Sequence, residues 1–462
     1  MKKVWILIGL IFITYLSISQ ERIGLSSDPS SGVYSIFLNP AFSSRYTMDW
    51  HVNALSFHQF LETDYSYLSN SNLFTALGEF DDLNIVTKRN QVSDGNSSRQ
   101  LIFDPDGGRK SFSVNTSILW PSALWKRSKT EKVGFFIHTR GMASGFRLPE
   151  EIGYYELEEV RDTTVTIPEF NVAASTWTDL GVHYSRILNQ DDYGSEAIGI
   201  NARLVLPHES GKFSSDNNVD YSRFQDTFSA VGLVTDGGYN FFPSGSTSYS
   251  PRINGIGLAL DIGYHHTTPD YSYGISLLDF GFSYTSRNAD NYSIVSDTTV
   301  VFDGSLVEDP NDIIGIIEEV DRQLEDQVSR VVEEGGSFLL GMPTAFSLQY
   351  ARPIGDHFMV SSQLVQRMPM FSQGLRRPNS LSSVLHYKSG HLSIALPITL
   401  YEYTDLRAGF RLMYRYFYIG TDHIASLVGS RKFSGTDLYL GFQIYPFSQV
   451  AGKKGVQCFD FK

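Results

Sequence analysis

A two-residue alternation that recurs along the chain constrains the fold more than any other feature. Between Gly255 and His265, large apolar side chains occupy every second position, and Gly, Ala, Asp or His occupy the positions between them. The pattern returns at residues 198–206, 392–400 and 438–444. Successive side chains of a β-strand point to opposite faces, so each segment predicts a strand with one apolar face. Near Leu277 the apolar phase slips by one residue, which indicates a β-bulge.

The alternation predicts about fourteen strands, of which the first and the thirteenth have the weakest pattern. Their expected ranges are 48–60, 111–125, 132–147, 172–188, 196–208, 254–267, 272–286, 343–354, 357–367, 380–389, 391–402, 406–418, 422–432 and 436–447.

Loop lengths favour one architecture for these strands. Connections after even-numbered strands are short, whereas those after the first, third, fifth and seventh strands have about 50, 24, 45 and 56 residues. Membrane-spanning β-barrels combine an even number of antiparallel strands with short turns on one side and long loops on the other. We therefore expect an all-β fold, a transmembrane β-barrel of about 14 strands over residues 48–447. A soluble exported β-rich binding protein is the alternative, because the strands of soluble sandwiches also alternate.

Aromatic residues near the expected strand ends support the barrel. Trp120, Trp125, Tyr401, Tyr414 and Tyr418 occupy such positions, where barrels place their interfacial girdles.

The N-terminus has the pattern of a secretory signal peptide. Lys2 and Lys3 precede an apolar run that ends at Leu16, and small residues precede Gln20, so we expect removal of residues 1–19. No later stretch reaches 18 uncharged apolar residues, which predicts a mature chain without a membrane-spanning helix.

Composition excludes several other classes of protein. The net charge is -13 and basic residues form no long run, so we expect no nucleic-acid partner. The single cysteine, Cys458, excludes an internal disulfide and cysteine-rich zinc sites.

One segment has the periodicity of a helix. Apolar residues recur at three and four positions within 309–335, where Asp309 is a candidate N-cap and Pro310 the first helical residue. The segment is acidic and predicts an amphipathic helix in a long outer loop. Residues 448–462 are expected to form a periplasmic C-terminal tail.

Short motifs resemble known barrel families. The segment before the first strand contains Asn39, Pro40 and Ala41, which resemble the Asn-Pro-Ala element of the outer-membrane fatty-acid transporter superfamily. The type IX secretion barrel component of Bacteroidota is similar to members of that superfamily. The resemblance implies an N-terminal plug, a hatch of residues 20–47 inside the lumen. Residues 341–344 and 436–441 are similar to those of an uncharacterised Bacteroidota barrel family, a domain of unknown function.

The sequence contains no motif for catalysis or cofactor binding. We therefore expect that the protein is not an enzyme, that it has no catalytic residues, and that it binds no cofactor and no metal. His265 and His266 are adjacent in a strand and point to opposite faces, which favours structural roles. Residues 104–108 contain only part of a calcium loop and are interpreted as a turn.

Three arginines share the face opposite the apolar side of one expected strand. Arg407, Arg411 and Arg415 follow at intervals of four, and charges facing lipid cost a few kcal/mol each, so we expect them in the lumen. They either form a salt-bridge network with acids of the plug or wall or build an anion-attracting constriction; the first alternative is favoured. The expected lumen-lining residues are Arg203, Arg407, Arg411, Arg415, Asp261 and Asp279.

These observations predict a non-enzymatic β-barrel in the outer membrane of a Gram-negative bacterium, after signal-peptide cleavage. Its expected role is the passage of small or hydrophobic solutes or the scaffolding of a surface or secretion complex. Its expected partners are outer-membrane lipid, a hydrophobic or anionic small solute, and a surface or secretion-complex protein.

Overall fold

The computed structural model describes residues 22–46, 48–69, 71–73, 84–87, 100–103, 110–148, 163–215, 219–224, 227–231, 234–239, 252–295, 300–303, 330–368, 370–371, 374–429 and 432–446. The predicted signal peptide, the fragment 104–108, Cys458 and the predicted tail 448–462 lie outside these ranges.

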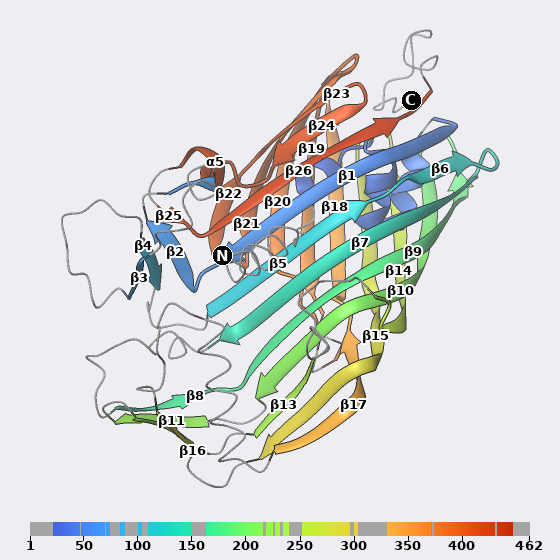
Figure 1. The fold of residues 1–462 in the computed structure, drawn as a ribbon. Coiled ribbons are helices and arrows are strands. Elements are labelled where there is room, and N and C mark those ends of the chain that lie inside the picture. Colours follow the sequence, from blue (N-terminus) through green and yellow to red (C-terminus); the bar gives the residue numbers. More distant parts are fainter. Residues whose placement is uncertain are drawn as a thin grey trace.

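An antiparallel sheet closes on itself to form the wall of a barrel (Figure 1). Within the described residues, eighteen strands make fourteen crossings, since four crossings consist of two strands in line: β5 with β6, β13 with β14, β17 with β18, and β22 with β23. Strand β1 (Trp50–Thr63) pairs with both its sequence neighbour β5 (Lys110–Leu119) and the last strand β26 (Gly435–Ile444), which closes the wall. The prediction of a fourteen-stranded antiparallel barrel is confirmed.

The remaining wall strands follow one another around the barrel in chain order. They are β6 (Ser122–Lys126), β7 (Glu131–Leu148), β9 (Phe170–Gln190), β10 (Ser195–Ser215), β13 (Val234–Tyr239), β14 (Gly255–Thr267), β15 (Ser272–Val295), β17 (Arg330–Gly341), β18 (Ala345–Ile354), β19 (Phe358–Arg367), β20 (Ser380–Ser389), β21 (Leu392–Tyr401), β22 (Asp405–Ala408), β23 (Phe410–Tyr414) and β24 (Phe417–Thr421).

The outward face of the wall is apolar. In β14 the outward residues Ile256, Leu258 and Ile262 are 55%, 59% and 47% exposed, whereas Ala259 and Asp261 between them are buried. Moving one such side chain from water to hydrocarbon gains about 1.5–3 kcal/mol, so an apolar face that surrounds the wall is suited to lipid. None of the helices described is long and apolar enough to cross a membrane.

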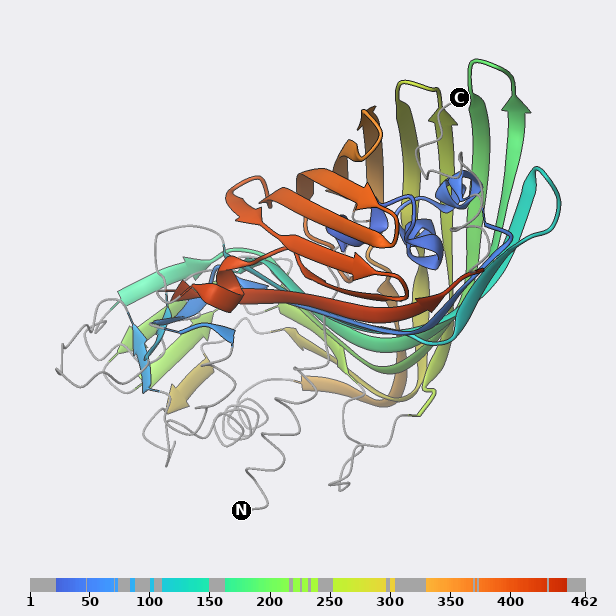
Figure 2. The same cartoon turned by 90° about the horizontal axis from the view of Figure 1, so that it is seen from above.

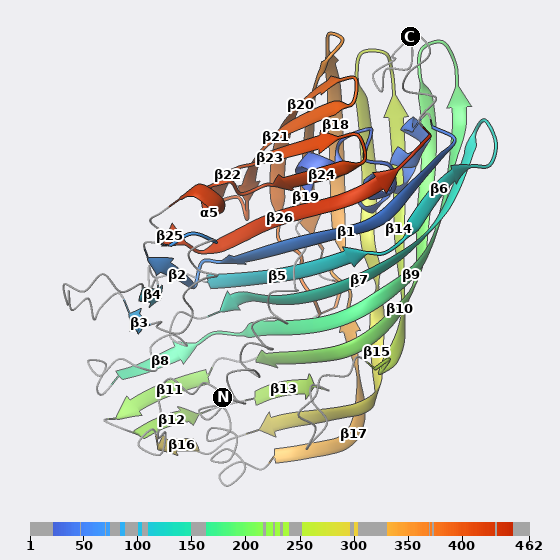
Figure 3. The same ribbon diagram turned by 45° about the horizontal axis from the view of Figure 1, so that its top comes forward.

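Loop lengths differ between the two ends of the barrel. Turns 127–130, 191–194, 268–271, 355–357, 390–391 and 415–416 lie at one end. The long connections lie at the other end and carry two small sheets (Figure 3). One sheet contains β8 (Thr163–Ile167), β11 (Val219–Phe224), β12 (Thr227–Val231) and β16 (Val300–Asp303); the other contains β2 (Ser66–Ser69), β3 (Asn84–Thr87), β4 (Gln100–Phe103) and β25 (Lys432–Phe433).

The thirteenth strand was wrongly placed by the sequence pattern. Strand β24 occupies Phe417–Thr421, and part of the expected range 422–432 forms the short helix α5 (Ala425–Val428). The chain reverses at Arg415 and Tyr416, in the middle of what alternates like a single strand. The reversal inverts the phase, so Tyr418 is buried inside the barrel and not in a girdle. Tyr401 is buried as well, whereas Trp120, Trp125 and Tyr414 are exposed as expected.

The segment before β1 lies inside the barrel. It contains the short helix α2 (Ile23–Ser26) and the two 3-10 helices η1 (Gly32–Phe37) and η2 (Pro40–Arg45), and most of its side chains are buried. These blue elements lie within the curve of the wall (Figure 2). We call residues 22–46 the hatch.

Most of the predicted acidic helix 309–335 lies outside the described residues. From Arg330 onwards the chain belongs to strand β17, so its last residues, 330–335, are strand.

Candidate functional site

Asn39 joins the hatch to the barrel wall. Its side-chain Oδ1 accepts from the backbone N–H of Ala41 at 2.9 Å, and Pro40 follows as the first residue of η2. Its Nδ2 donates to the carbonyl of Tyr264 at 3.0 Å and to Oε1 of Gln349 at 2.9 Å. The Asn-Pro-Ala motif thus both starts a helical turn and holds that turn against β14 and β18.

Three wall glycines allow this close approach. An ideal Cβ on Gly263 would lie 2.0 Å from Asn39 Oδ1, and one on Gly199 would lie 2.3 Å from the carbonyl carbon of Pro40. A Cβ on Gly274 would lie 2.7 Å from Asn39 Nδ2. Distances below 3.0 Å cannot be accommodated without movement, so the three glycines together form a docking surface for the motif.

A buried ion pair holds the start of the hatch. Asp28 Oδ2 lies 2.5 Å from Nη2 of Arg411 on β23 and accepts from Ser393 Oγ at 2.9 Å. Burial by itself raises the pKa of the Asp28 carboxyl, but Arg411, with His386, Lys388 and Ser30, outweighs burial and holds that pKa well below its ordinary value. Asp28 therefore remains charged and paired at neutral pH.

Further hydrogen bonds connect the hatch to strands around the barrel. They join Ile23 N to Asp422 Oδ2 (2.7 Å), Ser27 Oγ to His386 Nε2 (3.2 Å), Ile36 O to Asn201 Nδ2 (2.9 Å), Leu38 O to Ser276 Oγ (2.7 Å) and Ser43 Oγ to His183 Nε2 (2.8 Å). Each contributes about 0.5–1.5 kcal/mol, so together they hold the hatch in one position.

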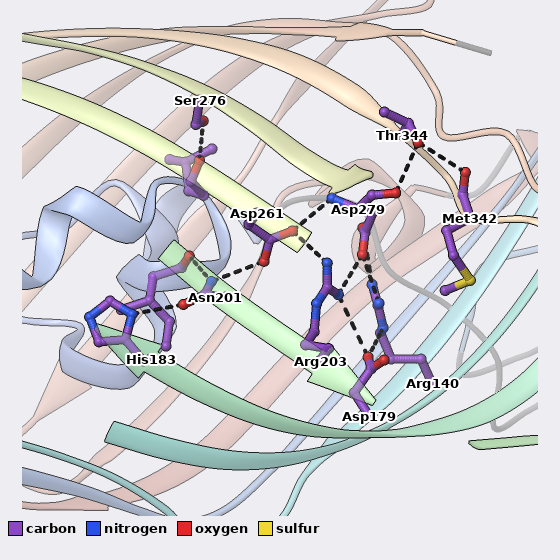
Figure 4. A network of polar contacts seen from close by, with 12 residues as sticks. Arg140, Asp179, His183, Asn201, Arg203, Asp261, Ser276, Asp279, Met342 and Thr344 are labelled. Atoms are coloured by element: carbon purple, nitrogen blue, oxygen red, sulfur yellow. Dashed lines mark hydrogen bonds and ion pairs between the residues drawn. The ribbon is translucent and has the colours of Figure 1, made fainter. Parts of the chain in front are cut away.

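Six charged side chains form a cluster of ion pairs beside the hatch, and five of them are labelled in Figure 4. Its cations are Arg140, Arg203 and Arg377, and its anions are Asp179, Asp261 and Asp279. We call this group the ion network. Arg140 contacts Asp179 at 2.8 Å and Asp279 at 2.7 Å, and Arg203 contacts Asp261 and Asp279, each at 2.5 Å. Arg377 also contacts Asp279. Three positive and three negative charges balance within the low-dielectric lumen, as buried charges require.

The predicted β-bulge positions Asp279. The register of β14 and β15 shifts between Leu260 and Ile262, and Asp279 has a positive φ of 51°. The bulge brings the Asp279 carboxylate into the lumen, where its own backbone N–H donates to Asp261 Oδ1 at 2.7 Å. The phase slip in the sequence thus marks a residue of the ion network.

The connection between β19 and β20 also folds inward. Leu375 N donates to the carbonyl of Gly341 at 3.0 Å, and Arg376 N donates to Ser144 Oγ at 3.0 Å. Leu375 and Arg377 are buried. The described residues of this connection, 370–371 and 374–379, which we call the inner loop, lie on the side of the long connections, whereas the hatch joins β1 at the short-turn end. The lumen therefore contains two inward segments that enter from opposite ends.

The residues predicted to line the lumen lie in different parts of the structure. Arg203, Asp261 and Asp279 form part of the ion network, whereas Arg407 pairs separately with Glu62 at 2.8 Å. Arg415 does not line the lumen: it lies exposed in the short turn after β23, because the chain reverses there. Of the three arginines predicted to share the lumen face, only Arg407 and Arg411 are buried inside the barrel.

Several important residues were missed from the sequence. Arg140, Asp179 and Arg377 complete the ion network, and Asp28 is the partner of Arg411. The inward phase of β7 and β9 could have identified Arg140 and Asp179. No periodicity marks Asp28 or Arg377, since both lie in irregular segments.

The two histidines considered as metal ligands have other contacts. The ring centroid of His265 lies 5.0 Å from that of Phe42, and the His266 ring lies tilted at the same centroid distance from the ring of Tyr273. The described residues contain no group of three or more His, Cys, Asp or Glu side chains arranged to hold a metal ion.

A closed antiparallel barrel with an apolar outer face and an inward N-terminal segment defines a plugged transmembrane β-barrel. Within this class, the chain belongs to the Family of unknown function (DUF5723), whose model matches residues 40–422. The match agrees with the expected domain of unknown function. Bacteroidota origin and a relation to type IX secretion stay predictions.

Solved structures with similarity to the chain include two channels named for hydrocarbons. The CymD monoaromatic hydrocarbon channel is 9% identical, with 90% of this chain and 93% of that chain covered and a TM-score of 0.35. The TodX monoaromatic hydrocarbon channel, as a deltaS2 mutant, is 8% identical, with 89% and 94% covered and a TM-score of 0.42. No curated protein matches the sequence. These sequence identities and TM-scores are too low to assign a function to the chain.

Proposed function

We propose that the protein is a non-enzymatic barrel of the outer membrane of a Gram-negative bacterium that admits small solutes, with the hatch as its internal closure. The observation that carries the proposal is the set of buried contacts between the hatch and strands around the barrel. A segment that fills the lumen without covalent attachment to the far wall can move without unfolding the wall.

Deletion of residues 23–36 tests this function. The deletion removes α2, Asp28 and nearly all of η1 but retains Asn39 and every wall strand. We expect the variant to insert into planar bilayers and to have a larger single-channel conductance than the full chain. Unchanged conductance in a correctly folded variant would exclude the hatch as the closure.

Scaffolding of a surface or secretion complex is a second candidate function. It is favoured by the two small sheets at the long-loop end, which extend beyond the barrel wall. Removing residues 219–231, the β11–β12 hairpin, should abolish partner capture in a cross-linking experiment and leave bilayer conductance unchanged if this role applies. The soluble alternative does not agree with the apolar outer face, because such a surface aggregates in water.

A further inference from the structure

A cavity lies between the hatch and the ion network. Its volume is about 50 Å³, which is room for a few water molecules or one small ion. Arg22, Tyr34 and Phe37 line it from the hatch, and His138 of β7 lines it from the wall together with members of the ion network. Charged, aromatic and aliphatic side chains line the cavity, which lies inside the plugged lumen.

The cations around this cavity outnumber the anions. The ion network has equal numbers of positive and negative charges, so the charge of Arg22 leaves one positive charge in excess. Among the described residues no carboxylate lies within ion-pair distance of Arg22, whose guanidinium contacts Ser117 and lies 4.7 Å from the ring of Tyr34. Asp437 acts on Arg22 only from a greater distance and is already bonded to His58 and to the backbone N–H of Asp422. A buried charge without a close partner is costly unless something compensates it.

His138 supplies an independent observation. The residue is only 6% exposed, and neither ring nitrogen has a hydrogen-bond partner among the described residues. Its ring contacts Phe37 at a centroid distance of 4.9 Å, which fixes the ring at the cavity. A neutral imidazole carries one N–H donor, and a buried polar group of this kind normally has a partner.

We propose that this cavity binds one small anion, of the phosphate or carboxylate class, between Arg22 and His138. The anion neutralises the surplus charge of Arg22 and accepts a hydrogen bond from the imidazole. The inference rests on the proposed function and deepens it, because it selects the anionic class from the two solute classes that the sequence leaves open. The solute site is then formed jointly by the hatch and the wall.

Equilibrium dialysis of the detergent-purified full chain against radiolabelled inorganic phosphate tests the proposal. We expect saturable binding of one phosphate per barrel and competition by acetate. Arg22→Gln removes the charge and should weaken binding about tenfold or more, the usual consequence of losing a hydrogen bond to a charged group. His138→Phe retains a ring against Phe37 and should also weaken binding.

Arg45→Gln is the matched control. Arg45 is the other hatch arginine without a carboxylate within ion-pair distance among the described residues, but it lines a separate cavity near Gln363. Its replacement should leave phosphate affinity unchanged. Absence of saturable binding in the full chain would overturn the proposal, as would equal affinities of the full chain and of a folded Arg22→Gln variant. Conductance of the hatch deletion is measured separately, so transport can stand when anion binding fails.

Discussion

At the scale of single residues, the absence of a side chain at Gly263 is as important as the presence of one at Asn39. Gly263→Ala places a methyl group against the Asn39 amide and should displace the Asn-Pro-Ala turn from the wall. We expect a higher single-channel conductance in planar bilayers, with unchanged barrel yield.

Ser276→Ala is the control for this substitution. Ser276 pairs in register with Gly263, and its replacement removes the hydrogen bonds to the carbonyl of Leu38 and from Nε2 of Gln349 without adding volume. It should cost about 1–3 kcal/mol and leave conductance nearly unchanged. Equal effects of the two substitutions would contradict a steric role for the glycine.

The Asp28–Arg411 pair predicts a pH dependence that appears only when the pair is broken. The folded-state pKa of Asp28 lies below its ordinary value of 3.8, so the stabilisation is complete above that value and is lost only as pH falls through the lower, folded pKa. The closed state of the full chain should therefore be insensitive to pH between 5 and 8. In the Arg411→Met variant, Asp28 remains buried but lacks its main counter-charge, so its carboxyl pKa rises. At high pH the carboxylate is charged and unpaired, which makes docking of the hatch unfavourable. Conductance should then be higher at pH 8 than at pH 5.

Two further variants check the cause of this effect. Asp28→Asn leaves Arg411 charged at every pH, so its channel should be open without pH dependence. The double variant Asp28→Asn with Arg411→Met removes both charges and should close again, because an absent pair costs less than an unpaired charge. A pH-independent Arg411→Met channel would refute the assignment of Asp28 as the titrating group.

At the scale of elements, we expect the hatch and the inner loop to close the lumen in series. Opening one of two closures in series changes conductance less than opening both. Arg377→Ala frees the inner loop from Asp279, which keeps Arg140 and Arg203 as partners. We expect little change in conductance from Arg377→Ala alone and a further increase when it is combined with the deletion of residues 23–36.

Arg376→Ala is the comparison for this pair, since it removes the same charge from the same loop without touching the contact to Asp279. Its addition to the hatch deletion should have no effect. If Arg377→Ala adds nothing to the hatch deletion, the inner loop is not a second closure.

At the scale of the whole molecule, a closed barrel with a lipid-facing surface should resist detergent at room temperature, since no strand edge is unpaired. Unboiled protein should migrate differently from boiled protein on a denaturing gel. Leu258→Arg places a charge on the apolar face at a cost of about 2–4 kcal/mol near the bilayer midplane and should lower the yield of the heat-modifiable form. Tyr193→Arg adds the same charge in an exposed turn and should leave the yield unaltered. Identical mobility of boiled and unboiled full chain would rule out the barrel.

The sequence by itself determined the barrel. Side-chain alternation is a local property of a strand, and loop lengths are counted along the chain, so both can be recognised without coordinates. The same local evidence located the bulge beside Asp279 and the Asn-Pro-Ala turn. It misplaced β24 for the same reason. The tight reversal at Arg415 occurs within a continuous alternation, and only the pairing of β24 with β23 and β26 identifies where the chain turns.

Only the tertiary structure decided which charges meet in the lumen. Asp28 lies 383 residues from Arg411 in sequence, and Asp279 lies 139 residues from Arg140. Ion pairing depends on distance in space, and strands far apart in the chain become neighbours only when the sheet closes and the hatch and inner loop fold inside. The balance of the ion network, the surplus charge of Arg22 and the glycine docking surface follow from that closure, so no pattern along the chain could have revealed them.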